Sequence, residues 1–380
     1  MFIKRITALI LCALITLSCF TGCNKEEPET EATTTSEATT VTEATTTSEA
    51  TTTTSAAPTR TAEEYKSAGI NELNSIPILM YHRIYDMKNA DTQYTGGNVD
   101  KDGYNRTAEA FEADLRSYYQ QGYRMMRLTD FVDGRIDVPF GYSPIIITFD
   151  DGIRDVVLQG WNEDGTPKFD PTCAIGILEK IKAEFPDYNV TATFFVNSGL
   201  FENGEENDRK IMKWMVDNGY DIGNHTKDHA KLGDCGAEEI EKQVGYIYKK
   251  LEEIIPGQYV NIVALPFGSP ESMPAEKPQY QKIFEGTYEG INYTTRASLL
   301  CGWTRAYAPF VREYNKTCIR RIRGYDNNGE DCDIEQNFKQ LAEGKRYISD
   351  GDPDTIVFPA ADNSSGTWLK DTFGHQAIPY

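Results

Sequence analysis

Basic residues are scarce in this sequence of 380 residues, because 38 Lys and Arg stand against 58 Asp and Glu, for a formal net charge of −20. Nucleic acids and anionic lipid surfaces bind proteins through basic patches. The charge therefore argues against both as partner classes, and it leaves neutral or cationic glycans open. At this length the chain can bury one large core, and about one or two domains are expected.

The N-terminal apolar run, residues 6–17, is too short to span a bilayer. Because Lys4 and Arg5 precede it, we interpret it as an export signal, so the chain is expected to leave the cytoplasm. The stretch "FTGC" resembles the lipobox of bacterial lipoproteins. That resemblance implies a signal peptide over 1–22, a lipidated Cys23 and a place on the extracellular face of the cell membrane. A plain secretory peptide with incidental cysteines is the alternative.

Large apolar residues are almost missing from the stretch 23–61, which consists mainly of Thr, Glu, Ala and Ser. Such a segment cannot repay the entropy of ordering by burying apolar surface. It is therefore predicted to be a disordered, extended spacer behind the lipid anchor. The folded domain is expected over 62–380.

Cysteine is present in odd number after this spacer, and no CxxC or Cys/His spacing suggests a structural zinc site. In an oxidising exterior one or two disulfides are possible, with at least one free thiol. The five residues concerned are Cys173, Cys235, Cys301, Cys318 and Cys332.

Apolar runs alternate with helical patterns along the rest of the chain. Strands are predicted over 76–84, 125–128, 143–149, 190–196 and 259–268, with a strand end at 220–226, and helices over 107–123, 172–185, 210–218 and 237–255. Strands that are apolar throughout and alternate with helices are typical of a parallel sheet covered on both faces. We therefore predict an α/β fold, with a (β/α) barrel as the leading candidate, and chemistry at the carboxyl ends of its strands.

Two acids, Asp150 and Asp151, follow the apolar run "IIITF" directly and precede Gly152. A single Asp at such a place is a helix cap or a turn former as often as it is a functional group. Two in a row before a glycine favour a functional pair, one carboxylate for a metal and its neighbour for a base.

Histidine is rare, with four residues in the whole chain, yet His225 and His229 stand four apart in "HTKDH". On a helical turn both rings would project from one face and hold one cation. A lone His is more often structural. Two of them together with an Asp predict three protein ligands, which leaves coordination positions open for water and substrate, as in catalytic sites.

The segments "TFDDG" (148–152), "HTKDH" (225–229) and "ALPFG" (264–268) resemble the first three motifs of the NodB-type polysaccharide deacetylases, carbohydrate esterase family 4. These metal-dependent enzymes remove N- or O-acetyl groups from glycans. The resemblance covers the chain from about residue 76 onward, and its third motif is partial. It implies a distorted or incomplete (β/α) barrel of the NodB-homology type.

Carried over motif by motif, the resemblance assigns the metal, with zinc the first choice, to Asp151, His225 and His229. It makes Asp150 the general base. The main-chain N–H of Phe267 is then expected to stabilise the oxyanion, with the flanking Pro266 and Gly268 near the substrate.

The sequence departs from the family pattern at Ala264, where members generally carry an Arg that orients the base. The segment "CIRRIRG" resembles an Ile-Pro-Arg-Ile segment of lipoprotein members, which makes Arg321 the candidate substitute. The alternative, that Arg320 and Arg321 are surface charges, is equally open.

The family's final Leu-x-His motif is not visible, and the last histidine, His375, stands in a different context. "PILMYHRI" instead resembles the N-terminal Tyr-His strand of circularly permuted members, and on that resemblance His82 is the general acid. A strand-end His that bonds a backbone carbonyl is the alternative.

The substrate is predicted to be a cell-surface or extracellular polysaccharide, most of all an amino-sugar glycan such as peptidoglycan or poly-N-acetylglucosamine. Trp161, Trp303 and Tyr307 are candidates for stacking on sugars, although aromatic residues are more often buried. Two further hypotheses stay open: an O-acetyl xylan esterase, and a noncatalytic glycan-binding lipoprotein with a degenerate site.

Overall fold

The computed structural model describes residues 60–87 and 95–380. The predicted signal peptide, Cys23 and the predicted spacer up to residue 59 lie outside the described residues. The first described helix, α1 (Ala62–Ala68), begins with a capping box. In it the Thr61 hydroxyl accepts from the Glu64 N–H, and the Glu64 carboxylate accepts from the Thr61 N–H.

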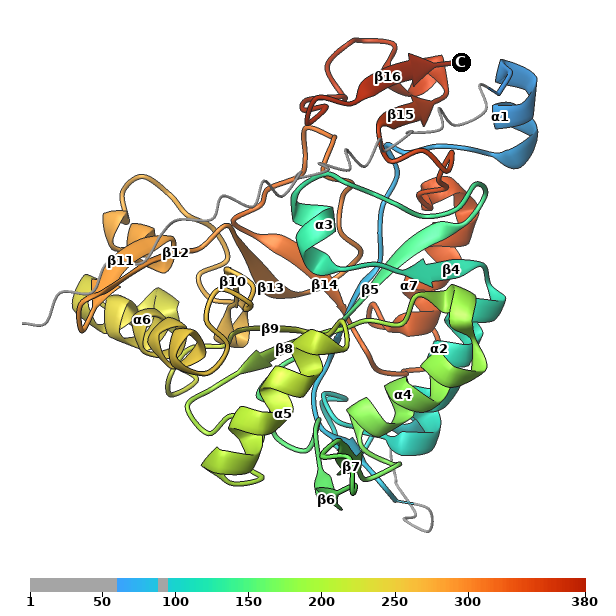
Figure 1. Ribbon diagram of the computed structural model, residues 1–380. Helices are drawn as coiled ribbons and strands as arrows, with labels where there is room; N and C mark the ends of the chain where they lie inside the picture. The colour runs from blue at the N-terminus through green and yellow to red at the C-terminus, as the bar shows by residue number, and fades with distance from the viewer. Residues whose placement is uncertain (1–59, 88–94) are drawn as a thin grey trace, which may run out of the picture. The chain divides into compact units, whose positions relative to one another are not determined.

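An eight-stranded parallel sheet forms the centre of the fold (Figure 1). Its strands follow the order β1 (Ile78–Tyr81), β14 (Ile319–Arg323), β13 (Ala297–Trp303), β10 (Ile262–Ala264), β9 (Asp221–Asn224), β8 (Thr193–Val196), β5 (Ser143–Phe149) and β4 (Tyr123–Met125). Because β1 also pairs with β5, every strand except β4 joins a closed barrel. The predicted α/β class and (β/α) barrel are confirmed, and a register shift between Leu299 and Trp303 distorts the barrel.

The strands are buried because their sequences are apolar on both faces. All residues of β1, β5 and β8 are buried. One face of each strand looks into the barrel and the other lies under helices, so neither face needs polar residues.

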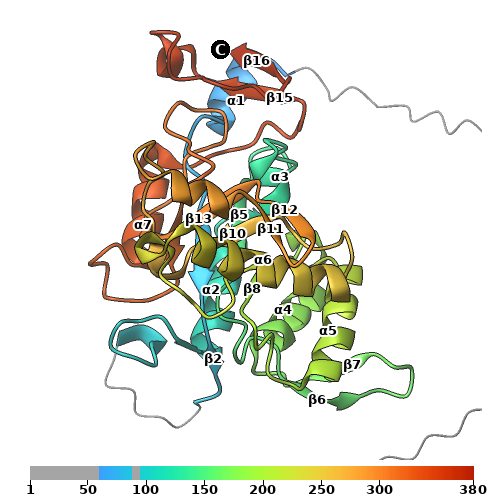
Figure 2. The same ribbon diagram turned by 90° about the vertical axis from the view of Figure 1, so that its left-hand side faces the viewer.

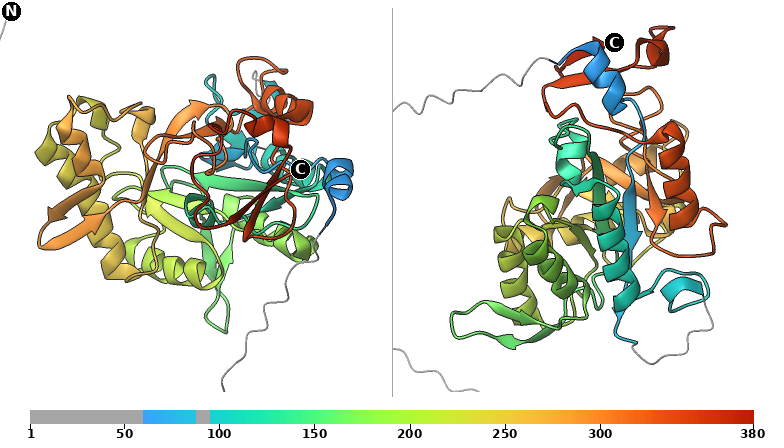
Figure 3. Two further views of the ribbon diagram at one scale, coloured as in Figure 1. Left: turned by 90° about the horizontal axis from the view of Figure 1, so that it is seen from above. Right: turned by 90° about the vertical axis from the view of Figure 1, so that its right-hand side faces the viewer.

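Five helices lie around the outside of the barrel, as Figures 1 and 3 show for the part of the chain with described coordinates: α2 (Ala108–Gln120), α4 (Ala174–Glu184), α5 (Glu205–Asp217), α6 (Ala237–Ile254) and α7 (Ile334–Gln340). The predicted N-cap of α2 is confirmed, since Thr107 accepts from the Ala110 N–H at 3.2 Å. Helix α5 begins at Glu205 instead of Lys210. Its first turn is acidic, which suits the positive end of the helix dipole.

The amino end of the barrel is closed by α3 (Leu128–Val132). Leu128 and Phe131 pack in one cluster with Ile78, Ile262 and Ile319, residues at or near the start of three strands. Helix α1 and the paired strands β15 (Thr355–Phe358) and β16 (Gln376–Pro379) lie at the same end (Figures 1 and 2).

Three further two-stranded sheets lie outside the barrel: β2 (Ile84–Tyr85) with β3 (Arg106–Thr107), β6 (Leu158–Trp161) with β7 (Pro167–Phe169), and β11 (Glu285–Tyr288) with β12 (Ile291–Thr294). Figure 1 places β6 and β7 at the end of the barrel opposite α1, β15 and β16.

Some sequence expectations need correction. The strand predicted over 76–84 is split into β1 and β2, because the chain leaves the sheet at His82. The five cysteines named above are all free, so the possible disulfides do not form among the described residues. None of the described helices is long and apolar enough to cross a membrane.

Candidate active site

The chain turns sharply where β5 ends. Asp150 is fully buried, whereas Asp151 and Gly152 adopt left-handed backbone conformations with φ of 77° and 75°. A Cβ atom at Gly152 would lie 2.3 Å from the Leu200 carbonyl oxygen, so only glycine fits there. The turn sends the two neighbouring carboxylates to different partners.

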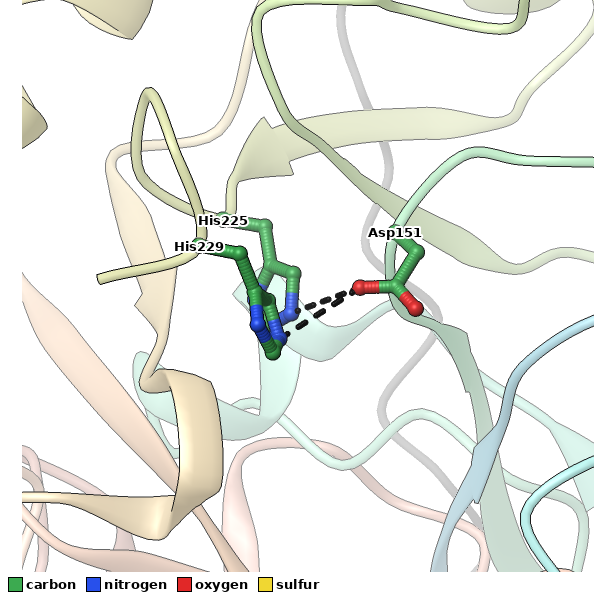
Figure 4. A group of neighbouring side chains, drawn as sticks. All are labelled: Asp151, His225 and His229. Carbon is green, nitrogen blue, oxygen red and sulfur yellow. Dashed lines mark ion pairs between the residues drawn. The ribbon is translucent and has the colours of Figure 1, made fainter. Parts of the chain in front are cut away.

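Asp151 faces His225 and His229 (Figure 4). Its Oδ1 lies 3.4 Å from His225 Nε2 and 3.5 Å from His229 Nε2. One donor atom from each of the three residues lies within 4.8 Å of the other two. The structure thus brings together the three ligands that the sequence predicted.

The predicted helical turn between the two histidines is wrong. Residues 225–230 form an irregular loop in which Thr226 and His229 have positive φ. The loop is fixed by its neighbours, since the Asn224 side chain accepts from the Thr226 N–H and the Gln243 carbonyl accepts from the Lys227 N–H. This loop still places the two rings with centroids 4.9 Å apart.

His225 is oriented as a metal ligand. Its Nδ1 lies 2.8 Å from the Ala264 carbonyl oxygen, which assigns the ring proton to Nδ1. Its Nε2 is buried, has no hydrogen-bond partner among the described residues and faces Asp151. A carbonyl behind a ligating imidazole is the usual outer-shell arrangement of metal sites. Two imidazoles and one carboxylate fit a divalent cation such as zinc.

The charges around Asp151 keep it ionised. Burial raises its pKa, but His225, His82 and His229 outweigh burial and hold the pKa well below the usual range of a carboxyl group. In turn Asp150 and Asp151 raise the pKa of His225 against the effect of its burial. The ionised carboxylate of Asp151 can therefore attract a cation.

Asp150 is paired with Arg321. The guanidinium donates two hydrogen bonds to the carboxylate, at 2.8 and 2.7 Å, and both side chains are 0% exposed. It also donates to Thr148 Oγ1 and to the Leu300 carbonyl oxygen. Burial raises the pKa of Asp150, but Arg321 and His225 outweigh it and lower the pKa below its ordinary value. Arg321 is thus not a surface charge, whereas Arg320 is exposed.

His82 lies at the end of β1, beside these groups. Its ring makes an edge contact with Tyr104, at a centroid distance of 5.1 Å, and its Nδ1 is buried without a hydrogen-bond partner among the described residues. Burial lowers the pKa of His82 below 6.5 in spite of Asp150 and Asp151. No backbone carbonyl of a described residue bonds to this Nδ1, so the alternative of a carbonyl-bonded ring finds no support at that nitrogen.

Phe267 borders the candidate metal ligands. Its ring is 62% exposed, makes an edge contact with His229 at 4.7 Å and sits on a backbone with φ of 58°. Pro266 is buried, and Gly268 packs so closely on β13 that a Cβ would lie 2.9 Å from the Cys301 nitrogen. A non-glycine residue in this conformation is typical of strained functional loops.

The predicted sugar-stacking residues are dispersed. Trp303, 40% exposed, ends β13, and its ring lies 4.3 Å from the Arg323 guanidinium. Trp161 is exposed on the β6–β7 hairpin, and Tyr307 is partly buried below Arg320. Trp303 stands at the same strand ends as the ligands.

Replacing Gly152 by Ala is expected to destabilise the fold by about 2 kcal/mol and to weaken metal binding, because the new methyl group meets the Leu200 carbonyl. Urea unfolding and metal titration would measure both effects. Gly165→Ala is the control, since Gly165 has φ of 82° but open space around it. Equal losses in the two variants would contradict the role given to the Leu200 contact.

The comparison with protein families agrees with these motifs. Residues 138–281 match the family described as polysaccharide deacetylase. These residues belong to the polysaccharide deacetylase family. The matched region includes Asp150, the three candidate ligands and Phe267, whereas His82 and Arg321 lie outside it.

Two curated relatives are deacetylases. The chain is 26% identical over 128 residues to a chitooligosaccharide deacetylase of Sinorhizobium fredii, covering 34% of this chain and 48% of that protein. It is 34% identical over 117 residues to a peptidoglycan-N-acetylglucosamine deacetylase of Bacillus cereus, covering 31% and 32%. The chain thus matches less than half the length of either relative.

Among solved structures, the deacetylase PplD of Streptococcus pyogenes in complex with acetate has a TM-score of 0.48 and 20% identity. The alignment covers 70% of this chain and 97% of that one.

Sequence reasoning missed part of this candidate site. Thr148 could have been found, since it shares a strand face with Asp150 two residues away. Tyr104 and Cys301 gave no signal, because a loop and a neighbouring strand bring them in only when the barrel closes. Burial raises the pKa of the Cys301 thiol, which therefore stays protonated.

Proposed function

We propose that this chain is a metal-dependent hydrolase that removes acetyl groups from a polysaccharide, and that its main substrates are N-acetylated amino-sugar glycans. The observation that carries the proposal is the cluster of Asp151, His225 and His229 beside the buried Asp150–Arg321 pair. A metal site next to an oriented carboxylate can supply both the activated water and the general base for hydrolysis of an amide.

The residues divide the chemistry among them. Asp151, His225 and His229 would hold a divalent ion, for which we propose zinc, and the bound ion would polarise the acetyl carbonyl and lower the pKa of water. Asp150 takes the proton from the attacking water while the new C–O bond forms, and the Phe267 N–H donates to the carbonyl oxygen as charge develops there. His82 gives a proton to the leaving nitrogen as the C–N bond breaks, and the products are acetate and a free amine.

Arg321 is proposed to do the work of the Arg that the family pattern places at position 264. The hypothesis of a noncatalytic binding protein depended on that missing Arg. Since Arg321 holds Asp150 by two hydrogen bonds, the ground for that hypothesis is weaker.

The glycan and the location are also proposals. The curated relatives act, by their names, on chitooligosaccharide and on peptidoglycan N-acetylglucosamine, which supports an amino-sugar substrate for this chain. Trp303 is proposed to stack on a sugar ring next to the reacting one. We also propose a lipoprotein attached through Cys23 at the extracellular face of the membrane.

Acetate release from chitopentaose, peptidoglycan and acetylated xylan, each with and without EDTA, tests the proposed function. Release from the first two that stops with EDTA and returns with added zinc is expected. Release from xylan alone would favour the esterase hypothesis, and no release from any of the three by metal-loaded protein would overturn the proposal.

Replacing His82 by Gln is expected to lower the rate on chitopentaose about 10²- to 10⁴-fold, because the amine then leaves without its proton donor. The rate on 4-nitrophenyl acetate should change little, since 4-nitrophenolate leaves without protonation. Equal losses on both substrates would show that His82 acts in another way.

A further inference from the structure

A cavity of about 720 Å³ opens at the amino end of the barrel. Its walls come from the end of α3, three residues of the segment 273–284, the residues before β13 and β14, and the C-terminal segment 370–373. Thr295 and Arg296 in its wall precede β13, whereas Trp303 at the other end of that strand belongs to the catalytic end. The cavity is therefore separate from the site described above, and its volume is that of a site for a small ligand.

An aromatic ring is held at the rim of this cavity. The Phe373 side chain is 37% exposed. Its backbone has φ of 50°, an unfavourable conformation for a residue with a bulky side chain. The Asp371 carboxylate accepts from the Phe373 N–H at 2.9 Å. A Cβ on Gly134 would lie 2.5 Å from the ring, so a glycine is needed beneath it. The fold thus holds a large apolar ring partly in solvent instead of burying it.

Hydrogen-bonding groups line the same cavity as the ring. The lining includes Lys316 and Lys370, neither of which forms an ion pair with any described residue, while Arg296 is paired with Asp133. Asn315 and Thr317 also line it. An aromatic face with several polar groups around it suits a pyranose ring, which has apolar faces and a polar edge. Two ammonium groups without an ion-pair partner among the described residues are unusual in a chain of net charge −20.

We propose that this cavity is a second, noncatalytic binding site for sugar units of an N-acetylglucosamine glycan. The choice of that sugar rests on the proposed function. The Phe373 ring stacks on the sugar, and the two lysines donate to its hydroxyl and acetamido oxygens. Because the site lies at the opposite end of the barrel from the metal ligands, it binds a second strand of glycan and keeps the enzyme near polymeric substrate.

Hydrogen–deuterium exchange of the full chain, with and without chitopentaose, tests this site. Slower exchange is expected over 314–317 and 370–374 in addition to the catalytic loops. Protection at the catalytic loops alone, or none at all, would overturn the second site. Acetate release is measured in the same samples, so a failure of the proposed function would appear there and not in the exchange at the cavity.

Phe373→Leu keeps an apolar contact with Gly134 but removes the aromatic face. Chitopentaose binding at the cavity, followed by the same protection, is expected to weaken about three- to tenfold. The rate on chitobiose should stay unchanged, while the rate on long chitin chains below saturation falls. Tyr142→Leu is the control, because Tyr142 is equally exposed at 37% and lies outside the cavity. Unchanged protection in Phe373→Leu, or the same loss in Tyr142→Leu, would contradict the stacking role.

Discussion

Replacing Asp151 by Asn is expected to remove the bound metal and the deacetylase activity together. Asn tolerates the left-handed backbone at this position, where φ is 77°, and it keeps the size of the side chain. The variant therefore loses the negative charge without a second, steric effect. With two neutral imidazoles left, we expect metal affinity to fall at least about 10²-fold and the rate at least about 10³-fold.

Metal content after dialysis and acetate release from chitopentaose measure the two effects. Zinc should also raise the melting temperature of the wild-type chain, because a ligand that binds only the folded state stabilises it, and this rise should disappear in Asp151→Asn. Asp228→Asn is the matched control, since Asp228 lies between the two histidines with its side chain half exposed and outside the ligand group. A variant without metal that keeps full activity would end the proposal of a metal-dependent reaction.

The fold was predictable where the residues of a single segment determine whether that segment forms a strand or a helix. The run "SPIIITF" is short, apolar and rich in β-branched residues, which favours a buried strand, and β5 has the predicted bounds. The same holds for the N-cap of α2 at Thr107. Closure of the barrel was not readable in this way, because the pairing of β1 with β5 and β14 joins segments far apart in sequence.

The candidate site likewise has residues that local sequence predicted and residues that depend on the tertiary structure. Asp150, Asp151, His225 and His229 sit in short motifs, so their residue types and spacing alone pointed to a metal and a base. The position of Arg321 was not decidable, because "CIRRIRG" offers two adjacent arginines, and only the strand register puts Arg321 inside and Arg320 outside. The loop that carries the two histidines was predicted as helical because spacing of four fits a helix. Hydrogen bonds that the Asn224 side chain and the Gln243 main-chain carbonyl accept hold this segment in an irregular loop instead.

Replacing Arg321 by Met is expected to lower both stability and activity strongly. The Asp150 carboxylate would remain fully buried without its partner, which costs about 3–5 kcal/mol of unfolding free energy. The site can avoid part of this loss only by protonating Asp150, and a protonated carboxyl cannot accept the proton of water. We therefore expect the rate on chitopentaose to fall about 10²- to 10⁴-fold with metal still bound. Urea unfolding, metal content and acetate release measure the three quantities.

Two further variants separate the charge of Arg321 from its bulk. Arg320→Met removes the neighbouring arginine, which is exposed, and should change stability by no more than about 0.5 kcal/mol. The double variant Asp150→Asn/Arg321→Met removes both buried charges, so its stability should recover toward that of the wild type, as is found when a buried ion pair is replaced as a whole. Its activity should not recover, because the base is gone. Recovery of stability without activity would show that the pair is kept for catalysis, whereas a double variant as unstable as Arg321→Met would mean that Arg321 acts through its packing and its bonds to Thr148 and Leu300.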